Sequence, residues 1–245
     1  MGHACSECNN QTTTTDIKTS ARAEDRVGAR QHVVGSARAV GPAVICLSER
    51  RDDQEGKYEG EEIHGVPHGR GTWSACVPRE DGFTTHYVYS GNWESGMQHG
   101  EGKEFWGDGS TFEGQFEFGK KNGRGSFSGD HSYRGQFQDN CMHGVGSYTW
   151  ADGRKFRGHF VEGQMSGHGT MEWPDGRVYD GQFADNLRHG TGQLKWPDGR
   201  IYEGQWRGGR QDGVGICTKP GLSGFTDRVS HWRIGHLIQL DTDTV

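Results

Sequence analysis

One short motif recurs seven times along this 245-residue chain and constrains its fold more than any other feature. The motif begins aromatic-x-Gly-x-aromatic, continues through Gly and His-Gly-x-Gly, and closes on Trp-x-Asp-Gly; one clear copy spans 179–199. The leading aromatics are Tyr58, Tyr89, Phe112, Tyr133, Phe156, Tyr179 and Tyr202. Four of the six steps between them are 23 residues long. A fixed period of this size predicts an array of identical structural units, each packed on its neighbours.

Within the copy at 179–199, apolar and polar residues alternate. Tyr179, Gly181 and Phe183 share one face of a segment whose other face is polar, which is the pattern of a half-buried strand. A polar loop is expected at 184–188, followed by a second strand at 189–196. Each repeat is therefore predicted to form one β-hairpin.

Successive hairpins are joined by a tight turn at 197–199. Proline presets the first turn dihedral, aspartate bonds its own backbone, and glycine takes a positive φ. Seven such units predict an all-β fold: an elongated single-layer antiparallel meander of about fourteen strands, curved and gutter-like, with helices nearly absent.

The glycine between the two aromatics of each copy should leave room for rings from a neighbouring strand to lie flat over the backbone. Aromatic side chains then supply most of the core, because each buries a large apolar area. The predicted repeat core consists of Tyr58, Tyr89, Trp93, Phe112, Phe116, Tyr133, Phe137, Phe156, Phe160, Tyr179, Phe183, Tyr202 and Trp206.

This pattern resembles the MORN-repeat family, on the Tyr-x-Gly-x-Trp/Phe, Gly and His-Gly-x-Gly positions. Departures occur at Glu62, which replaces the second aromatic, and at Asn140 and Asn186, which replace a usual glycine but also tolerate the left-handed conformation. The resemblance implies tethering, cytoskeletal assembly and binding of a partner helix, together with contact with phospholipid.

The repeats divide the chain into three parts. Residues 1–57 carry a candidate lipid anchor, a segment without repeats and, at 31–48, a candidate β cap for the first hairpin. Residues 58–218 form the seven-repeat array. Residues 219–245 have enough apolar content to fold back as a cap on the other end.

The first residues fit an N-myristoylation pattern, with Gly2 exposed after removal of Met1 and Ser6 at the required place. Cys5 and Cys8 lie close enough to accept palmitate, and two acyl chains are needed for stable anchoring. The same Cys-x-x-Cys pair also fits zinc binding or redox exchange, but no second pair has zinc-finger spacing. The dual-lipid interpretation places the chain on the cytoplasmic face of a membrane.

The sequence offers little support for nucleic-acid binding, metal binding or catalysis. The net charge of −6 argues against a nucleic-acid binder. The repeated histidines are interpreted as turn residues, since successive copies would stand about 10 Å apart, too far to share one ion; these are His68, His99, His143 and His189. No catalytic motif is present, so the sequence predicts no catalytic residue, no metal site and no cofactor.

Four tryptophans end strands at matching places: Trp106, Trp150, Trp173 and Trp196. A one-layer sheet cannot cover both its faces, so these rings should form a partly exposed stripe, and such stripes mark partner sites. A helix or peptide of a partner protein is expected along it. The open ends of the sheet are also compatible with a homodimer.

Three functions follow. The leading hypothesis is a non-enzymatic scaffold or tether, held at a membrane by N-terminal acylation. The second is a soluble cytoskeletal or axonemal component of a flagellum or basal body, with the N-terminal pattern a chance match. The third, which rests on the resemblance, is a regulatory subunit of a lipid kinase or a methyltransferase.

Overall fold

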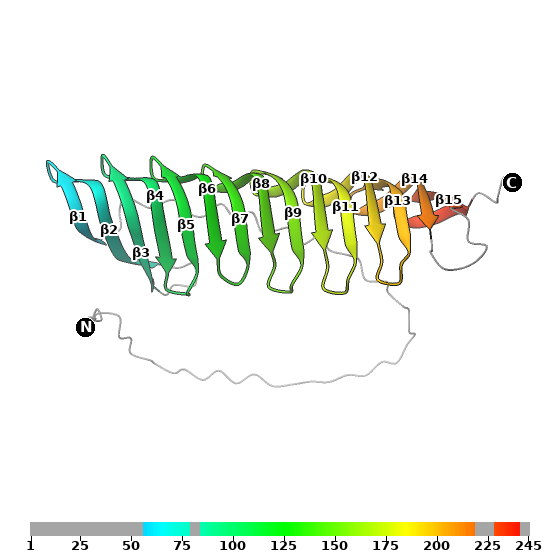
Figure 1. Ribbon diagram of the computed structural model, residues 1–245, viewed down its shortest axis with the longest axis horizontal. Helices are drawn as coiled ribbons and strands as arrows, with labels where there is room; N and C mark the ends of the chain where they lie inside the picture. Colours follow the sequence, from blue (N-terminus) through cyan, green and yellow to red (C-terminus); the bar gives the residue numbers. More distant parts are fainter. Residues whose placement is uncertain (1–55, 79–83, 219–227, 241–245) are drawn as a thin grey trace, which may run out of the picture. The chain divides into compact units, whose positions relative to one another are not determined.

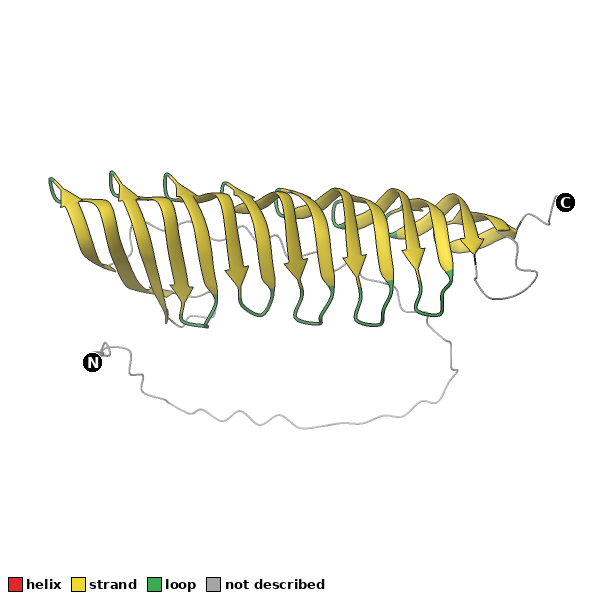
Figure 2. Cartoon of the chain, in the orientation of Figure 1, coloured by secondary structure: helices red, strands yellow, loops and turns green. Residues whose placement is uncertain are grey.

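The computed structural model describes residues 56–78, 84–218 and 228–240, which form β-strands and the short connections between them. All sixteen strands belong to one antiparallel sheet in which each strand pairs with the next along the chain (Figure 1). The described residues contain no helix (Figure 2). The prediction of a single-layer antiparallel meander is confirmed, and the sheet is open, with β1 and β16 at its two edges.

The strands are β1 (Gly56–Ile63), β2 (Val66–Pro78), β3 (Thr84–Glu94), β4 (Met97–Trp106), β5 (Thr111–Glu117), β6 (Lys120–Ser128), β7 (Ser132–Gln138), β8 (Cys141–Thr149), β9 (Lys155–Val161), β10 (Gln164–Glu172), β11 (Val178–Ala184), β12 (Leu187–Lys195), β13 (Ile201–Arg207), β14 (Arg210–Thr218), β15 (Arg228–Arg233) and β16 (His236–Leu240). The fourteen strands of the seven repeats are followed by one further hairpin, β15–β16, whose sequence carries no repeat motif. The N-terminal β cap expected at 31–48 lies outside the described residues.

Each hairpin closes with a two-residue turn in which both residues have positive φ, as at Asp185 (48°) and Asn186 (65°). This is the type I′ geometry, whose twist matches that of the flanking strands. The polar loop expected at 184–188 was therefore wrong: β11 continues to Ala184 and β12 begins at Leu187. Asn140, like Asn186, adopts the left-handed conformation, with φ of 67°.

Consecutive hairpins are joined by the Trp-x-Asp-Gly turn that the sequence predicts. Between β12 and β13, the Gly199 amide donates to the Trp196 carbonyl over 3.0 Å, and the Trp196 amide donates to the Arg200 carbonyl over 2.9 Å. Gly199 has φ of 86°, and the Asp198 carboxylate accepts from the Arg200 amide. The turn closes through the local chemistry of its own residues.

The His-Gly-x-Gly segment forms a β-bulge. Gly181 lies opposite Gly192, but Gln182, the next residue, lies opposite His189, so β12 carries two extra residues at this point. Gly190, inside the bulge, has φ of 57°. The Gln182 side chain accepts a hydrogen bond from the Thr191 amide over 3.0 Å, which satisfies a donor that the ladder leaves open.

The same contact recurs in other copies: Gln115 with Arg124, Gln136 with Val145, and Gln205 with Val214. The sequence placed this glutamine on a polar strand face without a specific contact. Its spacing of nine residues from the bulge amide is the regularity that could have revealed the bond.

Glycine runs in an unbroken row across the sheet, one residue from each of β1 to β14. The row consists of Gly60, Gly71, Gly91, Gly102, Gly114, Gly125, Gly135, Gly146, Gly158, Gly169, Gly181, Gly192, Gly204 and Gly215. The ring of Tyr179 covers both Gly181, two residues later on its own strand, and Gly192 on the next strand. The cover of Gly192 agrees with the expectation of rings from a neighbouring strand, and the cover of Gly181 adds a ring from the same strand.

Aromatic rings above this row form a continuous edge-to-face ladder. Neighbouring centroids are 5.0 to 5.7 Å apart and the ring planes cross at 78° to 90°. In order, the ladder comprises Tyr58, Trp93, Tyr89, Phe116, Phe112, Phe137, Tyr133, Phe160, Phe156, Phe183, Tyr179, Trp206, Tyr202 and Trp232. The first thirteen are the residues that the sequence assigned to the repeat core, and all but the half-buried Tyr58 are buried. Trp232 extends the ladder from β15 beyond the repeats.

Burial of tyrosines predicts a pH dependence. Desolvation raises the pKa of Tyr148 and of Tyr202 to about 12. Because an unfolded tyrosine has a pKa of about 10, the neutral rings contribute fully below that pH, and their contribution is lost as the pH rises towards 12. Phenolate absorbance and far-ultraviolet circular dichroism should therefore change together between pH 10 and 12. Titration of most tyrosines near pH 10 with the β spectrum intact would contradict this burial.

Candidate binding face

A second row of aromatics lies on the same face of the sheet as the ladder. It begins with Trp73, Tyr87 and Trp106, whose rings meet edge to face at 5.6 and 5.9 Å. The row continues through Phe127, His131, Tyr148 and Trp150. Trp173 and Trp196 occupy the matching places in later repeats. In the ladder only the two end residues, Tyr58 and Trp232, are partly buried, whereas this row includes partly buried rings along its length.

The four tryptophans proposed from the sequence as partner contacts belong to this second row, and together they are the tryptophan row. Trp106, Trp173 and Trp196 are partly buried and pack against the core. Trp150 is only 8% exposed and departs from the expected stripe. The reason is local, because the Tyr148 ring lies 4.6 Å from it and the Arg154 guanidinium 4.9 Å from it. Three of the four rings therefore remain within reach of a partner.

In Trp150, Trp173 and Trp196, an arginine four residues later in the chain lies over the ring. Arg177 lies 5.3 Å from the Trp173 ring and Arg200 lies 5.2 Å from the Trp196 ring. Each arginine also pairs with the aspartate of its turn, as in the 2.7 Å contact between Arg177 and Asp175. The amide of Arg177, and then its side chain, lower the pKa of the Asp175 carboxyl. The tryptophan row is thus bordered by neutralised ion pairs stacked on its rings.

A buried ion pair interrupts the aromatic face between β4 and β6. The Lys121 ammonium lies 2.5 Å from the Glu104 carboxylate, and both side chains are almost fully buried. The Tyr87 hydroxyl donates to the other carboxylate oxygen over 2.5 Å, and the Gln98 amide donates to that hydroxyl over 3.1 Å. Burial, followed by the Glu104 charge, raises the pKa of Tyr87. Lys121 also lies over the rings of three aromatics: Trp106, Phe112 and Phe116.

Sequence reasoning missed this network because Lys121 sits in a strongly polar stretch, Gly-Lys-Lys-Asn-Gly-Arg. The signal lies in the comparison of copies. The place of Lys121 is taken by Met142 and Met165 in the next two hairpins, and both methionines are buried. The place of Glu104 is taken by apolar residues elsewhere, such as Leu194. A charged pair thus replaces an apolar pair at one step of the array.

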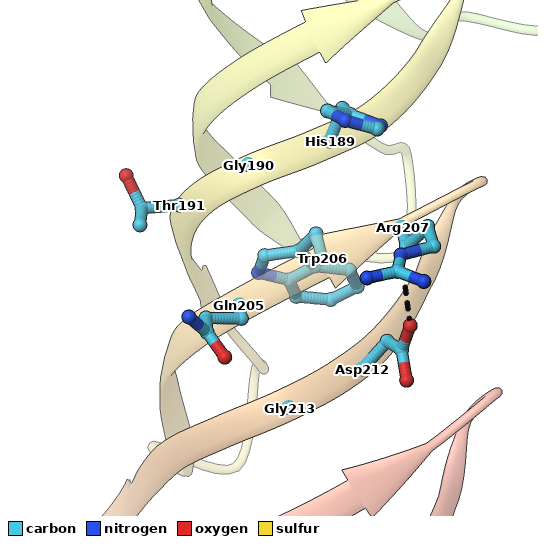
Figure 3. A pocket seen from close by; sticks show the side chains of 8 residues that line it. All are labelled: His189, Gly190, Thr191, Gln205, Trp206, Arg207, Asp212 and Gly213. Carbon is cyan, nitrogen blue, oxygen red and sulfur yellow. Dashed lines mark ion pairs between the residues drawn. The ribbon is translucent and has the colours of Figure 1, made fainter.

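A shallow pocket lies at the bulge of β12 and the strands that follow it (Figure 3). Three of its polar side chains, those of Arg207, Asp212 and Gln205, are engaged with the protein itself. Arg207 pairs with Asp212 over 3.1 Å, and Gln205 accepts from the Val214 amide. The pocket is a consequence of the bulge geometry.

The repeated histidines lie within strands β2, β4, β8 and β12, so their interpretation as turn residues was wrong. Across residues 56–78, 84–218 and 228–240 the structure contains no group of three or more potential metal-ligating side chains. The lipidation candidates Gly2, Cys5 and Cys8 lie outside the described residues. No helix within the described ranges is long and apolar enough to cross a membrane.

The comparisons with known proteins point to the same repeat. The MORN repeat family model matches residues 58–74, 89–111, 112–130, 133–153, 156–176, 179–199 and 202–221, which is more than half of the chain. No curated protein matches. Among solved structures, the chain is similar to the SAS-4 (dCPAP) TCP domain of Drosophila melanogaster, in complex with a proline-rich motif of Ana2 (dSTIL). That similarity has a TM-score of 0.36 and 9% identity, over 70% of this chain and 94% of that chain. With seven matched copies, the chain belongs to the MORN-repeat family.

Proposed function

We propose that this chain is a non-enzymatic scaffold whose tryptophan row binds a helix or peptide of a partner protein. Members of the MORN-repeat family are generally non-catalytic scaffold and binding proteins. The observation that carries the proposal is the difference in burial between the two aromatic rows on one face of the sheet. The ladder is buried and supports the fold, whereas Trp106, Trp173 and Trp196 keep part of their surface in solvent. Partly exposed aromatic rows of this kind favour partner binding.

The spacing of the row fits a helix. Successive hairpins advance by two strands, or about 10 Å. Seven residues of an α-helix rise about 10.5 Å. A partner helix lying along the row would therefore present apolar side chains at positions i and i+7 to matching tryptophans in successive repeats, such as Trp173 and Trp196.

Substitution of two tryptophans tests the proposal. In a pull-down from the source cell, the Trp173→Ala, Trp196→Ala double variant should retain about tenfold less partner protein than the native chain. The reason is that interface tryptophans commonly act as hot spots. The matched control is Lys155→Ala, Lys195→Ala, which alters two exposed residues of the same two hairpins and should leave recovery unchanged. Equal recovery by both variants, with the β spectrum intact, would contradict the proposed surface.

The proposal includes attachment to the cytoplasmic face of a membrane through myristoylated Gly2 and palmitoylated Cys5 or Cys8. The support is the N-terminal sequence pattern, and two acyl chains anchor more strongly than one. A myristate analogue should label the native chain but not a Gly2→Ala variant, and the Cys5→Ser, Cys8→Ser variant should be labelled yet release from membranes. An unlabelled native chain that locates to a flagellum or basal body would favour the soluble cytoskeletal alternative.

A further inference from the structure

Arg188, in β12, places a cation on the aromatic face beside Trp173 of the tryptophan row. Its guanidinium lies 4.2 Å from the Trp206 ring centroid, 5.7 Å from that of Tyr179 and 5.8 Å from that of Trp173. Its Nη2 donates to the Gly209 carbonyl over 2.7 Å. The residue is half-buried, so part of the side chain remains accessible.

Arg188 and Lys121 occupy the same place in their repeats. Lys121 lies opposite Phe116, and Arg188 lies opposite Phe183, which is the equivalent aromatic. Each cation also lies over the preceding turn tryptophan, Trp106 or Trp173.

The two sites differ in their counter-ion. Glu104, which neutralises Lys121, lies opposite Phe112 in β5. The residue in the same register before Arg188 is Met171, opposite Tyr179 in β11. Within the described part of the chain, the Gly209 carbonyl is the one hydrogen-bond acceptor recorded for the Arg188 guanidinium. Most of its five donors are thus left without a protein partner.

The surroundings make the charged form of Arg188 less stable than it is in water. Burial lowers the pKa of its guanidinium to about 10; Tyr179 opposes this shift in part, and the positive charge of Arg177 adds to it. A carboxylate in front of the guanidinium would reverse both effects, as Glu104 does beside Lys121. One guanidinium balances one carboxylate, since the neighbouring Arg177 is already paired with Asp175.

We propose that Arg188 anchors an aspartate or glutamate side chain of the partner segment that lies along the tryptophan row. This inference rests on the proposed function and adds the chemistry of the partner: an acidic side chain flanked by apolar residues at a seven-residue spacing. The guanidinium would hold the carboxylate through paired N–H···O bonds while its rear face stays stacked on Trp206.

The native repeats supply two test variants. Arg188→Met installs the residue found at Met142 and Met165, which the fold already accommodates. Met171→Glu installs an internal counter-ion in the register of Glu104. Both variants should keep the β spectrum and the thermal transition of the native chain, and both should remove the free cation.

The probe is a displayed library of helical peptides with fixed apolar residues at i and i+7 and randomised positions between them, selected against the full chain. Native protein should select peptides with an acidic residue. Replacing that residue by its amide should weaken binding about 10- to 100-fold on native protein, the range expected for a charged hydrogen bond, and should have no effect on Arg188→Met. Met171→Glu should weaken the acidic peptides to a similar extent.

Three results would overturn the inference: no selected peptides, selected peptides without acidic preference, or acid dependence that persists in Arg188→Met. Vesicles of phosphatidylserine form a separate arm, and binding to them that depends on Arg188 without acidic peptide selection would assign the cation to lipid instead. Peptides that lack acidic preference but need Trp173 would defeat the inference and leave the proposed function standing. Peptides that need neither an acidic residue nor Trp173 would contradict both this inference and the proposed function.

Discussion

Replacing Glu104 alone by leucine should lower the free energy of unfolding by about 3–5 kcal/mol. Leucine is the residue at the same place in β12, where Leu194 is buried, so the repeat accepts its shape. The loss comes from Lys121, whose ammonium would remain among three aromatic rings without its counter-ion. Chemical denaturation followed by circular dichroism measures the change.

The double variant Glu104→Leu, Lys121→Met separates charge from packing. Because methionine occupies the place of Lys121 in two other repeats, the double variant should return to within about 1 kcal/mol of the native stability or exceed it. The Tyr87 hydroxyl keeps a partner in the Gln98 amide, which can turn its oxygen to accept. Additive losses in the double variant would show that the pair itself stabilises the fold.

The exposed pair of Lys103 and Glu113, 3.0 Å apart, provides the control. Glu113→Ala should change stability by less than about 1 kcal/mol, since exposed ion pairs contribute little. A comparable loss in Glu113→Ala and Glu104→Leu would remove the distinction between the buried and the exposed pair.

Gly192→Ala should destabilise its part of the array by about 3 kcal/mol or more, at the upper end of overpacking costs. A Cβ at this position would lie 2.3 Å from the Tyr179 hydroxyl oxygen and 2.5 Å from its Cζ atom. The ring would have to leave the glycine row, and Tyr179 contacts both Phe183 and Trp206 in the ladder. One methyl group therefore disturbs several edge-to-face contacts.

Gly119→Asn is the matched control for Gly192→Ala. Gly119 has φ of 80° in a type I′ turn, and a Cβ there would meet nothing within 4 Å. Asn140 and Asn186 occupy the equivalent position in two other turns, so the control should change stability by less than about 1 kcal/mol. Hydrogen exchange resolves the effect by strand, because arrays open locally. Loss of protection in β11–β13 is expected for Gly192→Ala alone, and native protection there would contradict the packing described.

The sequence predicted what local chemistry and periodicity determine. Tyr179, Gly181 and Phe183 alternate over one strand, which revealed both the strand and its buried face. The Trp-Pro-Asp-Gly turn followed from the dihedral preferences of Pro197, Asp198 and Gly199. Seven copies of one pattern were enough to predict an antiparallel meander.

The rest depended on contacts between strands. The bond from the Thr191 amide to the Gln182 side chain spans a bulge, and only the nine-residue spacing that recurs in other copies indicates it. Lys121 is surrounded by polar residues in the chain and becomes buried only because β4 and β5 bring rings and Glu104 around it. The β15–β16 hairpin lacks the repeat motif, yet Trp232 continues the aromatic ladder. Comparing copies position by position would have singled out Lys121 and Arg188.

The most direct test of the docking surface is photo-cross-linking from the tryptophan row. A benzoylphenylalanine replaces either Trp196 or Lys195, which adjoin in sequence but differ in that Trp196 packs against the core and Lys195 is exposed. We expect Trp196→benzoylphenylalanine to cross-link one partner segment in the source cell and Lys195→benzoylphenylalanine not to do so. Equal cross-linking from both positions, or cross-linking only from position 195, would contradict this expectation.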